Sequence, residues 1–310
     1  MTTSIITQLP PDRRRRAPWE ERPTPAGQAG KGALLTFVVL AVLFPMWVIV
    51  VTSLSSRATI NAAGGLVIVP RGLDFSAYVA IFTSGRITRA LAVSAFLATV
   101  GTTISVGLTI LAAYGLSRRG SFAHRTQLFI FLLTFFVYPS LIPKYLVVTG
   151  LGLRNNLFAL ILPVAVNAFN LIVMRAFFMN LPQDLMDSAR IDGASEFRIL
   201  TRIVMPLSKA VIAVIALFYA VVYWNSFFDA MLYVERDLDP IQRVLQTYIL
   251  AGQAPPVRGD VANLPGVGSI PPSLAIQMAV VVVTILPCVL VYPFVQRHFI
   301  RGVIIGAIKG

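Results

Sequence analysis

Charged residues, cysteine and histidine are all scarce in this chain. Only 13% of the 310 residues are charged, whereas 56% are hydrophobic, and the mean hydropathy is +0.78. Because soluble domains carry about a quarter charged residues, this scarcity points to a membrane protein. The single cysteine, Cys288, excludes an internal disulfide framework and a multi-cysteine metal site. Two histidines, His124 and His298, also argue against a histidine-rich metal centre.

Catalytic and nucleotide-binding motifs are absent as well. The sequence contains neither the His-Glu-x-x-His pattern of zinc proteases nor the Gly-x-Ser-x-Gly elbow of serine hydrolases. The nearest approach to a phosphate-binding loop is Gly30-Lys31, but Pro25 replaces the first glycine and Gly32 replaces the required Ser or Thr. We therefore predict that the chain is not an enzyme and binds no cofactor. Any ATP and Mg²⁺ would be bound by another subunit.

The strongest feature present is a series of six apolar segments. Each has about 20 residues or more, enough for a helix to cross the ~30 Å hydrocarbon core of a bilayer. They cover residues 33–54, 90–116, 126–148, 157–178, 210–234 and 273–295. The predicted fold class is an all-α membrane protein with six transmembrane helices. For the first segment a signal peptide is the alternative, but no small-residue cleavage site follows it.

The distribution of basic residues predicts the orientation. The net charge of +13 could suggest nucleic acid, but no basic domain with interleaved aromatic residues occurs. With the N-terminus inside, 17 of the 26 Lys and Arg residues fall on cytoplasmic segments and the other 9 fall outside. This asymmetry predicts that both termini lie in the cytoplasm. We expect a disordered basic arm over 1–32, a transmembrane domain over 33–310 and a cytoplasmic tail over 296–310.

A polar stretch, residues 181–206, lies between the fourth and fifth apolar segments. It predicts two short helices: Asp184 would cap the first, Gly193 would turn the chain, Ser195 would cap the second and Pro206 would end it. On the second helix one stripe at i, i+3, i+4 and i+7 contains Phe197, Leu200, Thr201 and Val204. The predicted orientation puts this hairpin in the cytoplasm, where an apolar stripe needs a partner.

The same stretch resembles a known motif. Asp187-Ser188-Ala189, three residues, Gly193, nine residues, Ile203, one residue and Met205-Pro206 match the spacing of the Glu-Ala-Ala coupling loop in permeases of binding-protein-dependent ABC importers. The departures are Asp for Glu, Ser for Ala and Met for Leu. Residues 224–228 and 292–310 resemble the carbohydrate-uptake branch, and most of all its polysaccharide and oligosaccharide permeases. The resemblance covers the chain from Ala33 onward.

The resemblance implies a fold, a set of partners and a coupling role. The fold would be the type I importer permease fold, and the hairpin would dock into an ATPase subunit. The partners would be a second permease, two ATPase subunits, an extracytoplasmic binding protein and a carbohydrate, expected to be an oligosaccharide. The residues expected at the ATPase are Asp187, Ser188, Ala189, Gly193, Ala194, Phe197, Leu200, Ile203, Val204 and Pro206. The alternatives are a loop lying on lipid headgroups, an importer of the same fold for a polyamine or peptide, and a membrane enzyme or scaffold.

Polar residues inside the apolar segments are candidates for a substrate pathway, because buried polar groups in membranes are costly. The candidates are Asn167, Asn170, Tyr219, Tyr223, Asn225 and Gln277, with Ser226 beside them. Hydrogen bonding between helices is the alternative for each. Lys144 and Asp229 are interpreted as snorkelling residues or an ion pair. Bends are considered at Pro139, Pro143, Pro163 and Pro287.

Overall fold

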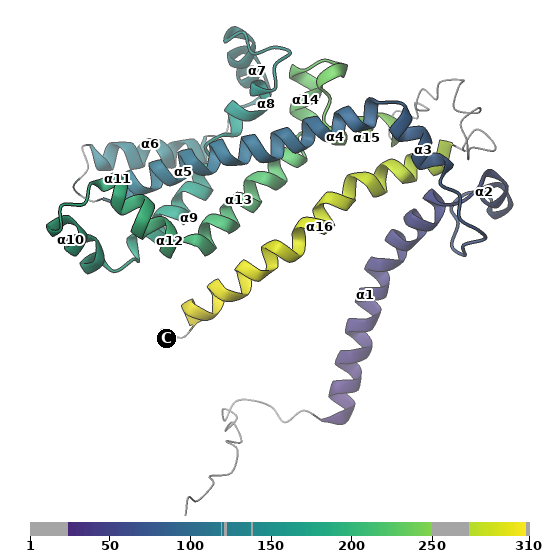
Figure 1. The fold of residues 1–310 in the computed structure, drawn as a ribbon, viewed down its shortest axis with the longest axis horizontal. Coiled ribbons are helices and arrows are strands. Elements are labelled where there is room, and N and C mark those ends of the chain that lie inside the picture. Colours follow the sequence, from purple (N-terminus) through teal and green to yellow (C-terminus); the bar gives the residue numbers. More distant parts are fainter. Residues whose placement is uncertain (1–23, 119, 121–122, 138, 250–272, 308–310) are drawn as a thin grey trace, which may run out of the picture. The chain divides into compact units, whose positions relative to one another are not determined.

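The computed structural model describes residues 24–118, 120, 123–137, 139–249 and 273–307, with side chains up to residue 293. Within these ranges the secondary structure is entirely helical (Figure 1). The chain divides into two compact units, residues 1–47 and 48–310, and the boundary falls inside helix α1, Pro25–Ser53.

The described part of the first unit is the N-terminal portion of α1. The helix starts at Pro25, so the predicted disordered arm over 1–32 is wrong for residues 25–32, while residues 1–23 lie outside the described part. Proline suits the first position of a helix because its missing N–H has no partner there anyway. The apolar side chains of this portion, such as Leu35 and Phe37, are exposed, which is expected of a helix that faces lipid.

The second unit consists of many helices of unequal length. The first part contains α2 (Arg57–Ala63), α3 (Ser76–Thr83), α4 (Arg86–Phe96), α5 (Thr102–Ser117), α6 (His124–Phe136), α7 (Leu141–Gly150), α8 (Phe158–Ile161) and α9 (Ala168–Met179). The second part contains α10 (Gln183–Ile191), α11 (Glu196–Ile199), α12 (Met205–Leu207), α13 (Lys209–Trp224), α14 (Phe227–Tyr233), α15 (Ile241–Ile249) and α16 (Ser273–Ala307). Two π-helical turns, Leu97–Gly101 and Leu200–Val204, join α4 to α5 and α11 to α12. Two 3₁₀ turns occupy Leu162–Val164 and Arg236–Leu238.

Three helices in the described residues are long and apolar enough to cross a membrane, and three bent helix pairs raise the possible number to six. The long ones are α1, the continuous helix Arg86–Ser117, and α16. The bent pairs are α6 with α7, the helix Phe158–Val164 with α9 (53°), and the helix Glu196–Leu207 with α13 (85°). The broken pairs contain Pro139 and Pro163, as considered from the sequence. Pro287, in contrast, lies inside the uninterrupted α16.

Two further differences from the predicted segments stand out. Helix α16 continues past residue 295 to Ala307, so the predicted tail 296–310 begins as a continuation of the helix. The stretch between the fifth and sixth predicted segments contains α15, whose buried face is formed by Ile241, Val244 and Tyr248. Their spacing of i, i+3 and i+7 is a helical signal that the short length of the segment obscured.

The core joins segments that are far apart in sequence. In one cluster, α5, α9 and α13 pack together with the 196–207 helix. Gly101 makes this possible, because a Cβ there would lie 2.8 Å from the Tyr223 ring. Small residues in membrane helices permit such close approach. In the other cluster, α3, α4, α15 and α16 pack together. Nearby, Asp239 forms ion pairs with Arg86 and Arg243.

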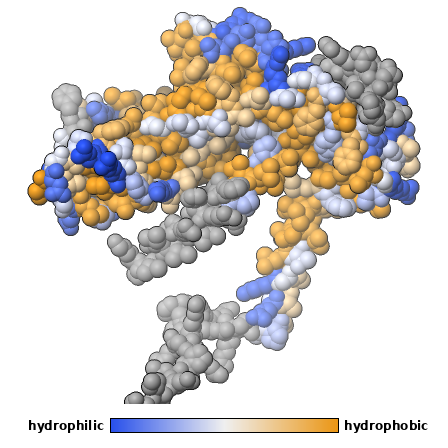
Figure 2. Space-filling view, in the orientation of Figure 1, coloured by the Kyte–Doolittle hydropathy of each residue, from blue (hydrophilic) through white to orange (hydrophobic). Residues whose placement is uncertain are grey.

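The face of the second unit that Figure 2 shows is largely hydrophobic. Hydrophilic residues gather over the α10–α11 end and over the α7–α14 end. Among the polar regions of the chain, these two ends contain residues that the sequence singled out, and both are candidate sites.

Candidate functional site

The first candidate is the hairpin formed by α10 and α11. Gly193 has φ 76°, in the left-handed region that favours glycine. The N–H of Ala194 donates to the carbonyl of Ala189 at 2.9 Å, and the N–H of Gly193 donates to the carbonyl of Arg190 at 3.0 Å. These bonds form a Schellman-type helix end. Gly193 therefore turns the chain, as predicted.

The caps of the two hairpin helices differ from each other. Ser195 caps α11 as predicted, since its hydroxyl accepts from the N–H of Arg198 at 3.4 Å. Pro182 occupies the cap position of α10 and makes no side-chain cap bond, so Asp184 lies within the first turn instead of at the cap. Asp184 still favours the helix start, because a negative charge there complements the positive end of the helix dipole.

The end of the hairpin lies close to its predicted place. The helix that begins at Glu196 passes through the π-helical turn and ends at Leu207, one residue after Pro206. It then bends by 85° into α13. The chain between Leu181 and Leu207 is thus a separate helical hairpin ahead of the apolar α13.

The apolar stripe on the second helix is not uniformly exposed, which corrects the prediction. Phe197 is 71% exposed, but Leu200 and Val204 are 3% and 1% exposed and belong to the chain's own core. Phe197 lies in the first turn beside the exposed bend, whereas Leu200 and Val204 lie in the π-helical turn that packs inward. The exposed apolar side chains of the hairpin tip are Ile191, at 87%, and Phe197.

The other predicted coupling residues divide in the same way. Asp187, Ser188, Gly193 and Pro206 are exposed. Ala189, Ala194 and Ile203 are partly buried against the core. The hairpin thus has an exposed surface around its tip and a base that is packed into the rest of the unit.

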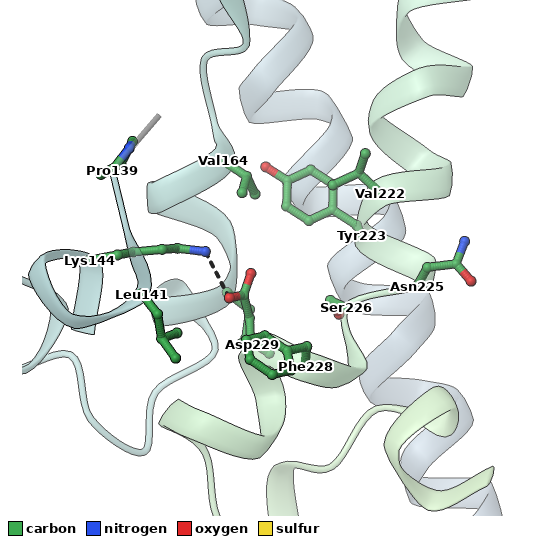
Figure 3. Close-up of a pocket in the computed structure, with 11 residues that line it drawn as sticks. Pro139, Leu141, Lys144, Val164, Val222, Tyr223, Asn225, Ser226, Phe228 and Asp229 are labelled. Carbon is green, nitrogen blue, oxygen red and sulfur yellow. Dashed lines mark hydrogen bonds and ion pairs between the residues drawn. The ribbon is translucent and has the colours of Figure 1, made fainter. Parts of the chain in front are cut away.

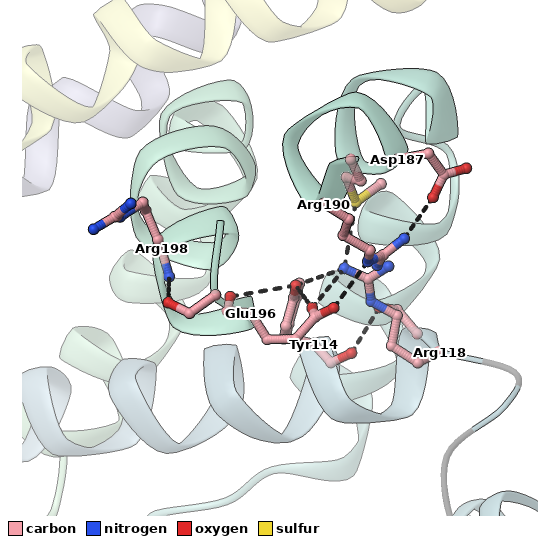
Figure 4. Close-up of polar contacts among 9 residues, drawn as sticks. Tyr114, Arg118, Asp187, Arg190, Glu196 and Arg198 are labelled. Carbon is pink, nitrogen blue, oxygen red and sulfur yellow. Dashed lines mark hydrogen bonds and ion pairs between the residues drawn. The ribbon is translucent and has the colours of Figure 1, made fainter. Parts of the chain in front are cut away.

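A network of charged groups fixes the hairpin to the end of α5 (Figure 4). Glu196 forms an ion pair with Arg118 at 3.2 Å and another with Arg190 at 2.9 Å. The Tyr114 hydroxyl donates to the same Glu196 carboxylate, and Arg118 lies over the Tyr114 ring at 4.7 Å. Asp187, which occupies the Glu position of the motif, pairs with Arg190 at 2.5 Å.

Hydrogen bonding from Tyr114 and Arg190 and the charge of Arg118 lower the pKa of the Glu196 carboxyl, in spite of its partial burial. The ionised form is therefore the one that the network stabilises. Glu196 lies in the first turn of α11, and its bonds to Tyr114 and Arg118 were not predicted from the sequence. The sequence signal for this network was Arg118, a basic residue that directly follows α5.

The predicted pathway residues do not all lie at one place, and most of them bond within the protein. Tyr219 bonds to Thr109 at 2.8 Å and Tyr223 bonds to Ser105 at 2.6 Å, so both tie α13 to α5. Gln277 donates to the carbonyl of Tyr248 at 3.0 Å, which ties α16 to α15. These contacts match the alternative of hydrogen bonding between helices.

The two asparagines of the fourth segment serve local structure. Asn167 caps α9, and its side-chain oxygen accepts from the N–H of Asn170 at 3.1 Å. The N–H of Asn167 in turn donates to the Tyr219 hydroxyl at 3.0 Å. Asn167 thus lies at the helix cap, and Asn170 is buried within α9.

The second candidate is a cavity of about 370 Å³ at the α7–α14 end (Figure 3). Lys144 of α7 and Asp229 of α14 form an ion pair across it at 2.7 Å, with side chains 16% and 23% exposed. The ion-pair interpretation from the sequence is therefore confirmed. Tyr223, Asn225 and Ser226 line the cavity, and the other predicted pathway residues do not. Asn225 bonds back to the carbonyl of Val221 at 2.8 Å.

Comparison with known proteins decides the family. Residues 105–305 match the model of the binding-protein-dependent transport system inner membrane component. The chain belongs to this family. The matched region contains both the α10–α11 hairpin and the α7–α14 cavity. As a member of this family the chain is a permease, the membrane component of an ABC importer, and it is not an enzyme.

Relatives extend the likeness over nearly the whole chain. The permease is 40% identical over 280 residues to the polygalacturonan/rhamnogalacturonan transport system permease protein YtcP of Bacillus subtilis, covering 90% of this chain and 96% of YtcP. It is 27% identical to the arabinooligosaccharides transport system permease protein AraQ of the same organism, covering 89% and 94%. A chain of a bacterial ABC transporter that imports the acidic polysaccharide alginate superposes with a TM-score of 0.82 at 28% identity, covering 91% of this chain and all of that chain. The ABC importer permease fold is thereby established.

Proposed function

We propose that this permease conducts a carbohydrate, an oligosaccharide, through a prokaryotic plasma membrane, and that ATP hydrolysis on separate subunits drives the transport. The functions of YtcP, AraQ and the alginate transporter support the substrate class, since all three handle saccharides. The proposed arrangement has six spans with both termini in the cytoplasm. A second permease, two ATPase subunits that bind ATP and Mg²⁺, and an extracytoplasmic binding protein complete the importer.

The observation that carries the proposal is the shape of the α10–α11 hairpin. Its base is packed into the core through Leu200 and Val204, while its tip presents Ile191 and Phe197 to the surroundings. A hairpin of this kind can transmit a displacement, because its base shares a core cluster with α5 and α13 and continues through a bend into α13. The exposed apolar side chains suit recognition of a hydrophobic groove, such as one on an ATPase subunit.

The predicted coupling residues then take separate roles. Phe197 contacts the ATPase, and Gly193 shapes the tip. Leu200 and Val204 anchor the base of the hairpin in the core of the permease, so that movement of the tip is passed to the spans. Asp187 is turned toward Arg190 and stabilises the tip, which gives the replacement of the motif's Glu a structural role.

Replacement of Phe197 by Asp tests the docking role. Because Phe197 is 71% exposed, the variant should fold as the wild type does, yet the ATPase subunit should no longer co-purify with the permease. Retention of the ATPase at the wild-type level would refute the role of Phe197 as an anchor. Phe197→Leu, which keeps an apolar side chain, is the matched control and should retain the ATPase.

A further inference from the structure

The cavity at the α7–α14 end contains more hydrogen-bonding capacity than the protein itself uses. The Ser226 hydroxyl oxygen is buried and, within the described residues, has no hydrogen-bond partner. Asp229 uses its Oδ1 for Lys144, and Lys144 retains further N–H donors after making that single bond. An unpaired buried hydroxyl is costly, so its presence in a cavity indicates a ligand that supplies the missing partner.

We infer that Lys144, Asp229 and Ser226 form a subsite for adjacent hydroxyl groups of a neutral saccharide unit, and that this subsite disfavours a carboxylate. The inference rests on the proposed function and assigns the substrate class of this cavity. A carboxylate accepts and an ammonium donates, whereas a sugar hydroxyl does both, so a pair of neighbouring hydroxyls can bond to Asp229 and Lys144 together. Ser226 supplies a third partner, and Phe228 an apolar face.

The charges of the cavity argue against an acidic sugar. Lys144 and Asp229 are the charged side chains among the described residues that line it, and their charges cancel. A ligand carboxylate would face Asp229 at close range, and the ammonium of Lys144 is already neutralised at 2.7 Å. Because both side chains are mostly buried, this repulsion is weakly screened by solvent. A hydroxyl brings no net charge and meets no such penalty.

The position of the subsite also suits a part of the transport pathway. It lies where the bent third span, through α7, meets α14 beyond the end of α13. Tyr145 of α7 and Tyr233 of α14 stack beside it at 5.9 Å, which holds the two helices together. The two sides of the cavity come from separate spans, so a bound sugar would contact both of them.

The test uses the assembled importer in lipid nanodiscs without its binding protein. Two labelled disaccharides serve as probes, a galactose disaccharide and the digalacturonate of the same linkage, which differ in carrying a hydroxymethyl group or a carboxylate on each ring. Equilibrium dialysis should show the wild type retaining the neutral probe about tenfold better than the acidic one, the ratio that 1.4 kcal/mol produces. Asp229→Asn removes the repulsion and frees Lys144, so it should shift the ratio toward the acidic probe by about tenfold or more.

Further variants keep the inference open to refutation. If Asp229→Asn fails to fold, Lys144→Gln with Asp229→Asn keeps the cavity uncharged, and the ratio should again fall. Ser226→Ala should weaken the neutral probe severalfold, whereas Tyr233→Phe, which removes a buried hydroxyl outside the cavity lining, should not. An unchanged ratio in the folded variants, or equal binding of both probes by the wild type, would overturn the subsite. Cells that carry the whole importer and take up neither sugar nor any longer saccharide would refute the proposed function itself.

Discussion

The two ends of this permease use ionic groups in opposite ways. At the α10–α11 end, Glu196 is 57% exposed and shares its charge among two arginines and a tyrosine. At the α7–α14 end, a single pair of Lys144 and Asp229 is mostly buried. A shared, hydrated network changes little when one bond is lost, whereas a buried pair leaves an uncompensated charge. The first arrangement suits a hairpin that moves, and the second suits a cavity with defined chemistry.

Breaking the buried pair should have the largest effect on stability. Asp229→Ala leaves the Lys144 ammonium unpaired, which costs about 3 kcal/mol for a buried pair. The variant should show a clear fall in the melting temperature of the purified importer. The double variant Lys144→Met with Asp229→Leu removes both charges and should melt near the wild type. Equal melting of Asp229→Ala and wild type would show that the pair is effectively solvated.

A change at the hairpin turn should have the second largest effect. Gly193→Val places a β-branched residue at φ 76°, and this conformation costs roughly 1–2 kcal/mol for residues with a Cβ. Space is not the obstacle, because no neighbouring atom lies within 4 Å of the position that a Cβ would take. Uptake should be lost while the ATPase continues to hydrolyse ATP without coupling. Gly193→Asn, which tolerates the left-handed region, should retain much of the uptake.

The contrast between the two ends also explains which features the sequence could predict. Gly193 and Ser195 follow from local turn chemistry, which acts within a few residues and is legible in the sequence. The burial of Leu200 and Val204 depends on the tertiary core cluster that they join with residues of α5, α9 and α13. Helical spacing alone does not distinguish these two residues from the exposed Phe197. The π-helical turn at 200–204 also departs from the 3.6-residue period that the stripe assumed.

Tertiary structure likewise determines which polar residues of the spans are hydrogen-bonded within the chain. Asn167, Tyr219 and Gln277 looked like pathway candidates, yet each bonds to a neighbouring helix or caps its own. Lys144 and Asp229 lie 85 residues apart, so their pairing across a cavity depends on the packing of α7 against α14. Residue type indicates that burying these polar groups in a membrane costs free energy. Only the fold shows which of them already have a hydrogen-bond or ion-pair partner within the chain.

Weakening the exposed network should produce the smallest change in stability. Glu196→Gln keeps the shape of the side chain and removes the charge that Arg118 and Arg190 share, for a loss of about 1 kcal/mol at such an exposed site. Because the folded state lowers the pKa of Glu196, its contribution is present above the unfolded pKa of about 4.3 and is lost as the pH falls through the lower folded value. The variant should therefore lose stability less steeply than the wild type below about pH 4.3. Asp192→Asn, on the same hairpin but outside the ion pairs of the described residues, should keep the wild-type pH profile. If Glu196→Gln also kept that profile while uptake fell severalfold, the network would act in positioning the hairpin and not in holding it folded.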